Sequence, residues 1–175
     1  INGDGGTDIL SGGVGDDITF TAAIDDSSAN NTALTLVAAS GNVDLQGDAG
    51  AGTALGAFTI SSSAVADLND VVASSIAVTS SDIDLNTDAY TAAAGGDVTF
   101  TGAVDLDQSG GTTTITSGGG AGDDITFTAA IDDDAAGDTA LTLTAGGGDV
   151  TFGSTVGASN AIGALTVLGN DLDLS

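Results

Sequence analysis

Aspartate is the residue type in this chain with the greatest capacity for chemistry. All 25 acidic residues are aspartates, and no lysine, arginine or histidine accompanies them, so the formal net charge is −25. Carboxylate oxygens are the ligands that Ca²⁺ prefers. We therefore predict calcium ligands among the clustered aspartates of the turn-like segments, which are Asp8, Asp16, Asp17, Asp25, Asp26, Asp123, Asp124, Asp132, Asp133 and Asp134.

Two further observations bear on this calcium hypothesis. Residues 8–17 read Asp-x-Leu-x-Gly-Gly-x-Gly-x-Asp, a spacing that resembles one junction of the glycine-rich calcium repeats of secreted toxins. Two like charges about 5 Å apart repel by roughly 3 kcal/mol at an effective dielectric near 20, and this chain has no basic side chain to offset that repulsion. The alternatives are plain glycine-aspartate turns and a solvated acidic surface that keeps the chain soluble.

The same composition argues against several functions. Carboxylate pairs can hydrolyse glycosides, but these aspartates are dispersed and repeated, and one tyrosine and no tryptophan are present to stack on a sugar. We therefore expect no enzyme. Without lysine or arginine we expect neither nucleic acid nor anionic membrane as a partner. No apolar run approaches the ~20 residues that span a bilayer, so we expect no membrane insertion.

An internal repeat organises the chain. Residues 1–68 align without a gap with residues 108–175 at a constant offset of 107, and residues 69–107 complete the first copy. The segment GDDITFTAAIDD at 15–26 returns unchanged at 122–133. Such self-similarity is typical of repeat architectures. We treat 1–175 as one segment without internal domain boundaries, and we expect its uncapped ends to meet further repeats of the polypeptide or another copy.

Short triplets that alternate apolar, small or polar, apolar recur along the chain, as at 18–20, 34–36 and 98–100. This period-two pattern, bounded by glycine and aspartate, predicts short strands. The threonine-centred triplets start near every twentieth residue, which fits one turn of a three-sided coil. We predict an all-β, right-handed parallel β-solenoid of about eight coils with five turns per repeat. We also expect Phe20, Leu36 and Phe58 to stack in one inward column.

Tandem β-sandwich repeats are the alternative fold, because short strands with frequent turn signals also occur in sandwiches. The chain has no tryptophan, one tyrosine and five phenylalanines, which suits the narrow core of a solenoid better.

A family resemblance points the same way. GDVTFTGAVDLD at 96–107, GGGDVTFGSTVGASNAIGALTV at 146–167 and ALTVLGNDLDLS at 164–175 resemble the tandem repeats of giant bacterial surface and secreted proteins of the filamentous-haemagglutinin type. The resemblance implies a parallel β-helix, export across the envelope, and adhesive or fibre-forming work.

We therefore expect a structural protein at the cell surface or outside the cell, either a fibre subunit or the rod-like shaft of an adhesin. Its expected partners are other copies of itself, end to end, or further repeats. The alternative functions are a calcium-dependent repeat module of a secreted protein, and ice binding through outward threonines at 19–21, 99–101 and 126–128. Aspartate occupies the corresponding outward place in other triplets, at Asp44, Asp84, Asp105 and Asp173.

Overall fold

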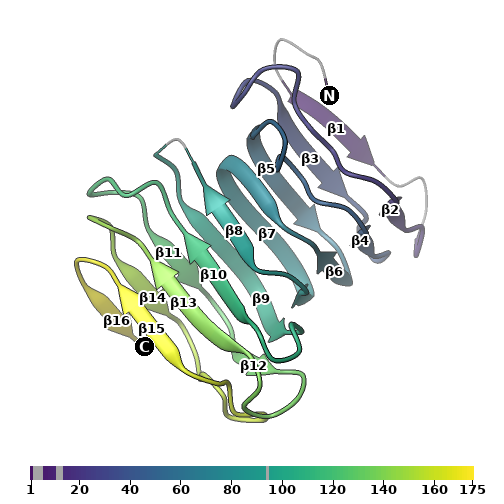
Figure 1. The fold of residues 1–175 in the computed structure, drawn as a ribbon. Coiled ribbons are helices and arrows are strands. Elements are labelled where there is room, and N and C mark those ends of the chain that lie inside the picture. The colour runs from purple at the N-terminus through teal and green to yellow at the C-terminus, as the bar shows by residue number, and fades with distance from the viewer. Residues whose placement is uncertain (2–5, 11–13, 94) are drawn as a thin grey trace.

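The computed structural model describes residues 1, 6–10, 14–93 and 95–175 (Figure 1). Every strand pairing in this part of the chain is parallel. The described residues form no helix that could cross a membrane. The strands are β1 (Gly6–Leu10), β2 (Ile18–Phe20), β3 (Ala33–Val37), β4 (Val43–Leu45), β5 (Leu55–Ser62), β6 (Val65–Leu68), β7 (Val71–Leu85), β8 (Ala89–Ala92), β9 (Val98–Leu106), β10 (Thr112–Thr116), β11 (Ile125–Phe127), β12 (Ile131–Asp133), β13 (Ala140–Thr144), β14 (Val150–Phe152), β15 (Leu165–Leu168) and β16 (Leu172–Leu174).

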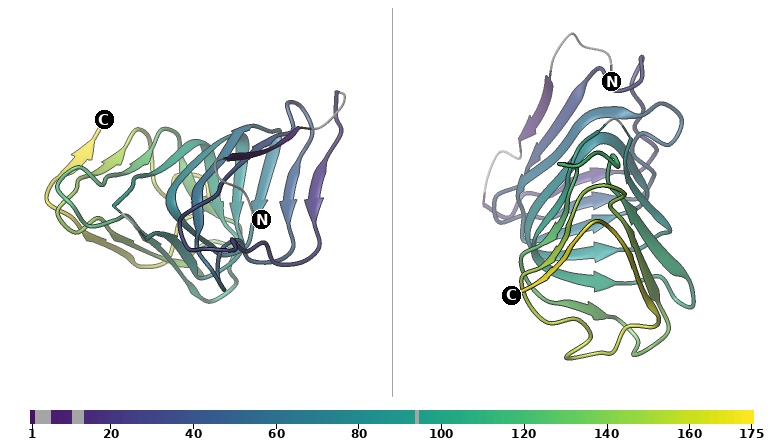
Figure 2. Two further views of the ribbon diagram at one scale, coloured as in Figure 1. Left: turned by 90° about the horizontal axis from the view of Figure 1, so that it is seen from above. Right: turned by 90° about the vertical axis from the view of Figure 1, so that its left-hand side faces the viewer.

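The chain winds into a three-sided coil whose strands stack in register from turn to turn (Figure 2). Face 1 consists of β1, β3, β5, β11, β14 and β16, with the middle of β7 and the start of β9. Face 2 consists of β2, β4, β6 and β12, with the ends of β7 and β9. Face 3 consists of the start of β7 with β8, β10, β13 and β15.

This arrangement is a β-solenoid of about seven turns, against the eight coils expected. The predicted all-β parallel solenoid is confirmed. The tandem sandwich is excluded for the described residues, because sandwich strands pair antiparallel.

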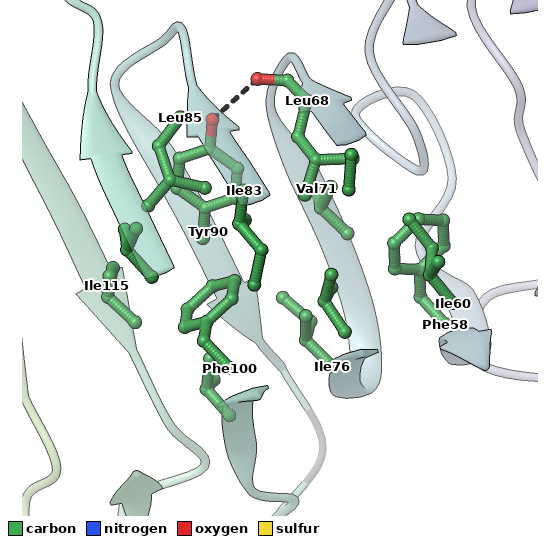
Figure 3. Close-up of a cluster of buried hydrophobic side chains, with 14 of the residues drawn as sticks. Phe58, Ile60, Leu68, Val71, Ile76, Ile83, Leu85, Tyr90, Phe100 and Ile115 are labelled. Carbon is green, nitrogen blue, oxygen red and sulfur yellow. Dashed lines mark hydrogen bonds between the residues drawn. The ribbon is translucent and has the colours of Figure 1, made fainter. Parts of the chain in front are cut away.

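The core follows from the alternation of apolar and polar residues. In β3 and β13, for example, alternate residues are buried, because successive side chains of a strand point to opposite sides. Buried residues of successive turns then lie directly above one another, as Leu34, Phe58 and Ile76 do. Figure 3 shows part of this core, in which the Tyr90 hydroxyl donates a hydrogen bond of 2.7 Å to the Leu68 carbonyl oxygen.

The few aromatic residues of the second half are stacked. Phe127 lies between Phe100 and Phe152, with ring centroids 5.5 and 5.7 Å away and rings nearly parallel. Tyr90 and Phe100 pack edge to face, with their ring centroids 6.4 Å apart. These rings fill a core that leucine, isoleucine, valine and alanine otherwise supply.

The repeat does not match a whole number of turns. Ile18 starts a strand on face 2. The in-register pairs Ile18–Val43, Val43–Ala66, Ala66–Ile83 and Ile83–Val104 connect it to Val104 on the same face, four turns later. Its copy Ile125 follows two faces later, on face 1, so one repeat spans four and two-thirds turns rather than five. The prediction that Phe20 stacks with Leu36 and Phe58 is therefore wrong. The threonine-centred triplets occur on all three faces, so their spacing does not measure one turn.

Candidate functional site

The most distinctive polar feature is a ladder of aspartates along face 2. Each occupies the outward centre of its strand and pairs in register with the next. The residues on either side are buried, and all of them are apolar except Asp133, so the central aspartate points to the solvent side. We call this feature the aspartate ladder; it consists of Asp44, Asp67, Asp84, Asp105 and Asp132.

One part of the ladder is crowded. One carboxylate oxygen from each of Asp82, Asp84 and Asp105 lies within 4.8 Å of the other two, and all three residues are half-buried. Burial, followed by the charges of Asp82 and Asp67, raises the pKa of Asp84 to about 6. Burial and the neighbouring carboxylates also raise the pKa of Asp105.

This cluster can relieve its repulsion in two chemical ways. The raised pKa of Asp84 means that it takes up a proton more readily than an isolated aspartate. A hard cation could instead share the carboxylate oxygens, although Ca²⁺ takes six to eight oxygen ligands and water would have to supply most of them.

The predicted calcium ligands are mostly elsewhere, and several hold neighbouring turns together. Asp25 Oδ1 accepts a hydrogen bond of 2.8 Å from the Gly52 N–H, one turn further along the chain. Its copy Asp132 accepts one of 2.8 Å from the Ser159 N–H, at the same offset of 107. Only Asp132 among the predicted ligands also belongs to the aspartate ladder.

A second pair repeats the same contact. Asp17 Oδ1 accepts from the Asn42 N–H at 2.7 Å, and Asp124 Oδ1 accepts from the Asp149 N–H at 2.8 Å. Asp17 precedes a strand of face 2 and Asp124 a strand of face 1, so the two copies lie at different corners and do not stack with each other.

A third pair is buried and holds a loop. Asp26 Oδ2 accepts from the Thr32 N–H at 2.6 Å, and Asp133 Oδ2 accepts from the Thr139 N–H at 3.0 Å. Burial acts to raise the pKa of Asp26, but the hydrogen bonds from Thr32 and neighbouring N–H groups outweigh it and lower that pKa. The Oδ1 atom of Asp133 is buried without a hydrogen-bond partner.

The remaining predicted ligands share no common site. Asp123 Oδ2 accepts from the Gly120 N–H at 2.6 Å, Asp16 is exposed, and Asp134 lines a small hollow of about 60 Å³. The backbone of Asp8 pairs with Thr35 in β1, but its side chain and residues 11–13 of the toxin-like pattern lie outside the described residues. Calcium binding by these aspartates stays a prediction.

Sequence reasoning missed the aspartate ladder as a site, although its signal was visible. The triplets at 43–45, 83–85 and 104–106 have aspartate between two apolar residues. They place Asp44, Asp84 and Asp105 outward, but which triplets are neighbours depends on the lengths of the turns between them.

Comparison with protein-family models, with curated proteins and with solved structures finds no match to this chain. The resemblance to filamentous-haemagglutinin-type repeats therefore stays a prediction, and the geometry of the three faces has to support any functional proposal.

Proposed function

We propose that this chain is a structural segment of an extracellular rod, either a fibre subunit or the shaft of a bacterial surface adhesin. The observation that carries the proposal is the parallel hydrogen-bonded stack, which continues through about seven turns. Each inner turn is bonded to the turns on both sides, so opening one turn exposes backbone groups of its neighbours as well. Such a stack is stiff along its length.

Aspartates reinforce the stack without ion pairs. Carboxylates of one turn accept N–H groups of the next, as Asp25 and Asp132 do, and hydrogen bonds to charged groups are roughly twice as strong as neutral ones. We assign the chain no catalytic role, because it lacks the histidine, cysteine, lysine and arginine that most reaction mechanisms use.

The surface of the last turn supports end-to-end contact. The inward residues Leu165, Leu172 and Leu174 are 43, 45 and 70 % exposed. Within the stack, the corresponding apolar residues are covered by the next turn and are fully buried, as Leu141 and Val150 are. The proposed occupant of this surface is another turn of the same kind, from a further repeat or a second copy.

Location is tested on the cells that produce the protein. An antibody raised against the purified chain, used with immunogold electron microscopy, should label the surface of intact cells or filaments outside them. Label that appears only after the cells are permeabilised would overturn the extracellular proposal.

Assembly is tested on the purified chain by light scattering and electron microscopy as salt is raised. We expect growth into filaments with a fixed axial spacing, and we expect Leu172→Asp with Leu174→Asp to prevent it. Thr79→Asp is the control, because Thr79 is exposed and lies on β7, an inner strand of the stack. A monomer under all conditions, or equal assembly of both variants, contradicts end-to-end contact.

We include calcium as a stabilising ion in this proposal, because no basic side chain offsets the charge of −25. An ion that binds only the folded chain raises its stability in proportion to RT ln(1 + [L]/Kd). The melting temperature should therefore be higher in CaCl₂ than in NaCl of matched ionic strength. Equal melting temperatures would mean that calcium acts only by screening charge, as any salt does.

A further inference from the structure

The second half of face 3 presents threonines in a two-dimensional array. The strands β8, β10, β13 and β15 are neighbours in register, and their outward residues form two columns. One column contains Thr91, Thr116 and Thr144, and the other contains Thr114, Thr142 and Thr166. Ala89 and Leu168 complete these two columns, and Thr112 and Ala140 are a further outward pair at the start of β10 and β13. We call this surface the threonine lattice.

The backbone fixes the two spacings of the lattice. Neighbouring strands lie about 4.8 Å apart, and alternate residues of one strand lie about 6.7 Å apart. The inward residues Tyr90, Ile115 and Leu143 are fully buried and hold the strands in place. Threonine is branched at Cβ and has few side-chain rotamers, so little entropy is lost when its hydroxyl is held in one position.

The threonine lattice is polar and uncharged, and its threonines are half-buried except for Thr166, which is exposed. None of its hydroxyls forms a hydrogen bond to another residue of the described chain. The strands β8, β10, β13 and β15 contain no acidic residue, whereas the strand centres of face 2 carry the aspartate ladder. Tyr90 is the one aromatic residue in the strands β8, β10, β13 and β15, and it is fully buried, so these strands offer no ring to stack on a sugar.

From these observations we propose that the threonine lattice binds the ordered water of an ice surface. Ice is a periodic lattice of oxygen atoms that donate and accept hydrogen bonds, and a periodic, uncharged array of hydroxyls has the chemistry to meet it. Each hydroxyl can donate one hydrogen bond and accept two, so the array can fit into such a water layer at many points at once. Ice carries no net charge, so the acidity of the other faces keeps the chain soluble without opposing contact.

Face 1 provides a matched control within the same molecule. Its central outward column contains Thr59, Thr99, Thr126 and Thr151, but Ala77 interrupts it between Thr59 and Thr99, and it ends at Asp173. Beside it, Thr79 and Thr101 are a second outward pair. Aspartates border this column in the second half of the chain, at Asp97, Asp124 and Asp149. An interrupted column that borders charges and ends in one offers a smaller regular array than face 3, so we expect it to contribute little.

The experiment measures the gap between the melting and freezing temperatures of a single ice crystal, together with the shape of the crystal. The 175-residue chain should open such a gap and facet the crystal. Thr116→Tyr with Thr142→Tyr should abolish both effects, because the rings stand above the lattice. Thr59→Tyr with Thr126→Tyr, on face 1, should retain them. Circular dichroism confirms folding, and the single variant Thr142→Tyr replaces the double variant if that fails to fold.

Three outcomes overturn the proposal. They are the absence of any temperature gap with the unaltered chain, an equal loss in the face 1 variant, and retention on crystalline cellulose or chitin without any effect on ice. None of them bears on the extracellular rod, which immunogold labelling and assembly test separately.

Discussion

At the scale of single residues, the repeat preserves hydrogen-bonding roles rather than positions around the coil. Asp25 and Asp132 each accept an N–H group of the next turn, and each donor lies 27 residues further along the chain. Asp25 nevertheless follows face 3, whereas Asp132 lies on face 2. Asp26 and Asp133 likewise hold equivalent loops. A carboxylate that accepts backbone N–H groups of a neighbouring segment needs only that segment at the right distance, and every corner of the coil provides one.

Replacing Asp133 tests this loop-holding role. Asp133→Ala leaves the N–H groups of Asp138 and Thr139 without their acceptor in a buried place, which should cost about 1–3 kcal/mol. Asp133→Asn keeps an acceptor oxygen and should cost less. Urea unfolding measures both, with Asp134→Ala as the control because Asp134 is exposed. Equal stability of Asp133→Ala and Asp134→Ala would contradict the role.

The crowding at Asp84 predicts a pH dependence of opposite sign to that of most acidic residues. Its pKa is about 6 in the folded chain against 3.8 for the ordinary residue. Between these values the folded state binds more protons than the unfolded state, so this contribution to stability rises as pH falls from 7 towards 4. Asp84→Asn should stabilise the chain at pH 7.5 by up to about 1 kcal/mol, since half-exposed charges are screened.

Melting temperatures at pH 7.5 and 4.5 measure this effect. Asp88→Asn is the control, because it removes the same charge from an exposed corner. If both variants gain the same stability at pH 7.5, the effect comes from net charge and the crowding at Asp84 contributes nothing.

The sequence suggested the aspartates of the turns as the candidate site, whereas the structure brings together aspartates at strand centres. The difference has a physical explanation. Adjacent aspartates such as Asp25 and Asp26 look like a cluster, but consecutive side chains diverge and each finds its own N–H partner. Asp84 and Asp105 are 21 residues apart, and the solenoid stacks them. Their contact depends on turn length, which a single sequence does not encode in a simple pattern.

At the scale of elements, identical triplets contribute differently to stability because they lie at different places in the stack. Phe127 is fully buried between two rings, whereas Phe20, in the same Ile-Thr-Phe sequence, is half-buried. Phe127→Ala should cost about 3–5 kcal/mol, as large-to-small changes in a packed core do, and Phe20→Ala should cost clearly less. Denaturant unfolding of the two variants measures the difference. Equal losses would mean that the aromatic stack adds nothing to this core.

Glycine is required where one turn closes against another. Gly102 has a φ of +136°, and a Cβ there would overlap the Ser80 carbonyl oxygen of the preceding turn. Gly102→Ala should therefore destabilise the chain by about 1–3 kcal/mol for the backbone alone, with the overlap adding to it. Gly122→Ala is the control, because open space surrounds that position. Thermal unfolding should separate the two variants, and equal melting temperatures would contradict the close approach.

Strands were predictable because their signal is local. The alternation in 34–36 and 98–100 fixes which side chains point inward, and both segments lie in strands with that orientation. The order of strands around the coil was not predictable in the same way. One turn takes 18 residues between Phe58 and Ile76 and 27 between Val98 and Ile125, because loops at the corners vary freely in length.

At the scale of the whole molecule, the length of the sequence repeat is not a whole number of solenoid turns. Equivalent residues of successive repeats therefore lie on different faces. One repeat covers four and two-thirds turns, so each successive copy would be rotated by one face. The same residues then face a different side, and an array of such repeats would present each feature on three sides in succession. In such an array no feature would be confined to one side, which is compatible with the shaft or fibre that we propose.

Pairs of introduced cysteines test this rotation, because the chain has no cysteine of its own. Thr19 and Asp44 are in-register neighbours on face 2, about 4.8 Å apart by strand spacing, whereas Thr35 lies on face 1. Spin labels on Thr19→Cys with Asp44→Cys should show strong dipolar broadening. Labels on Thr19→Cys with Thr35→Cys should show much less, since the two strands belong to different faces. Strong broadening in the second pair would mean that Thr19 and Thr35 stack on one face. The repeat would then fit five whole turns, and successive copies would not be rotated.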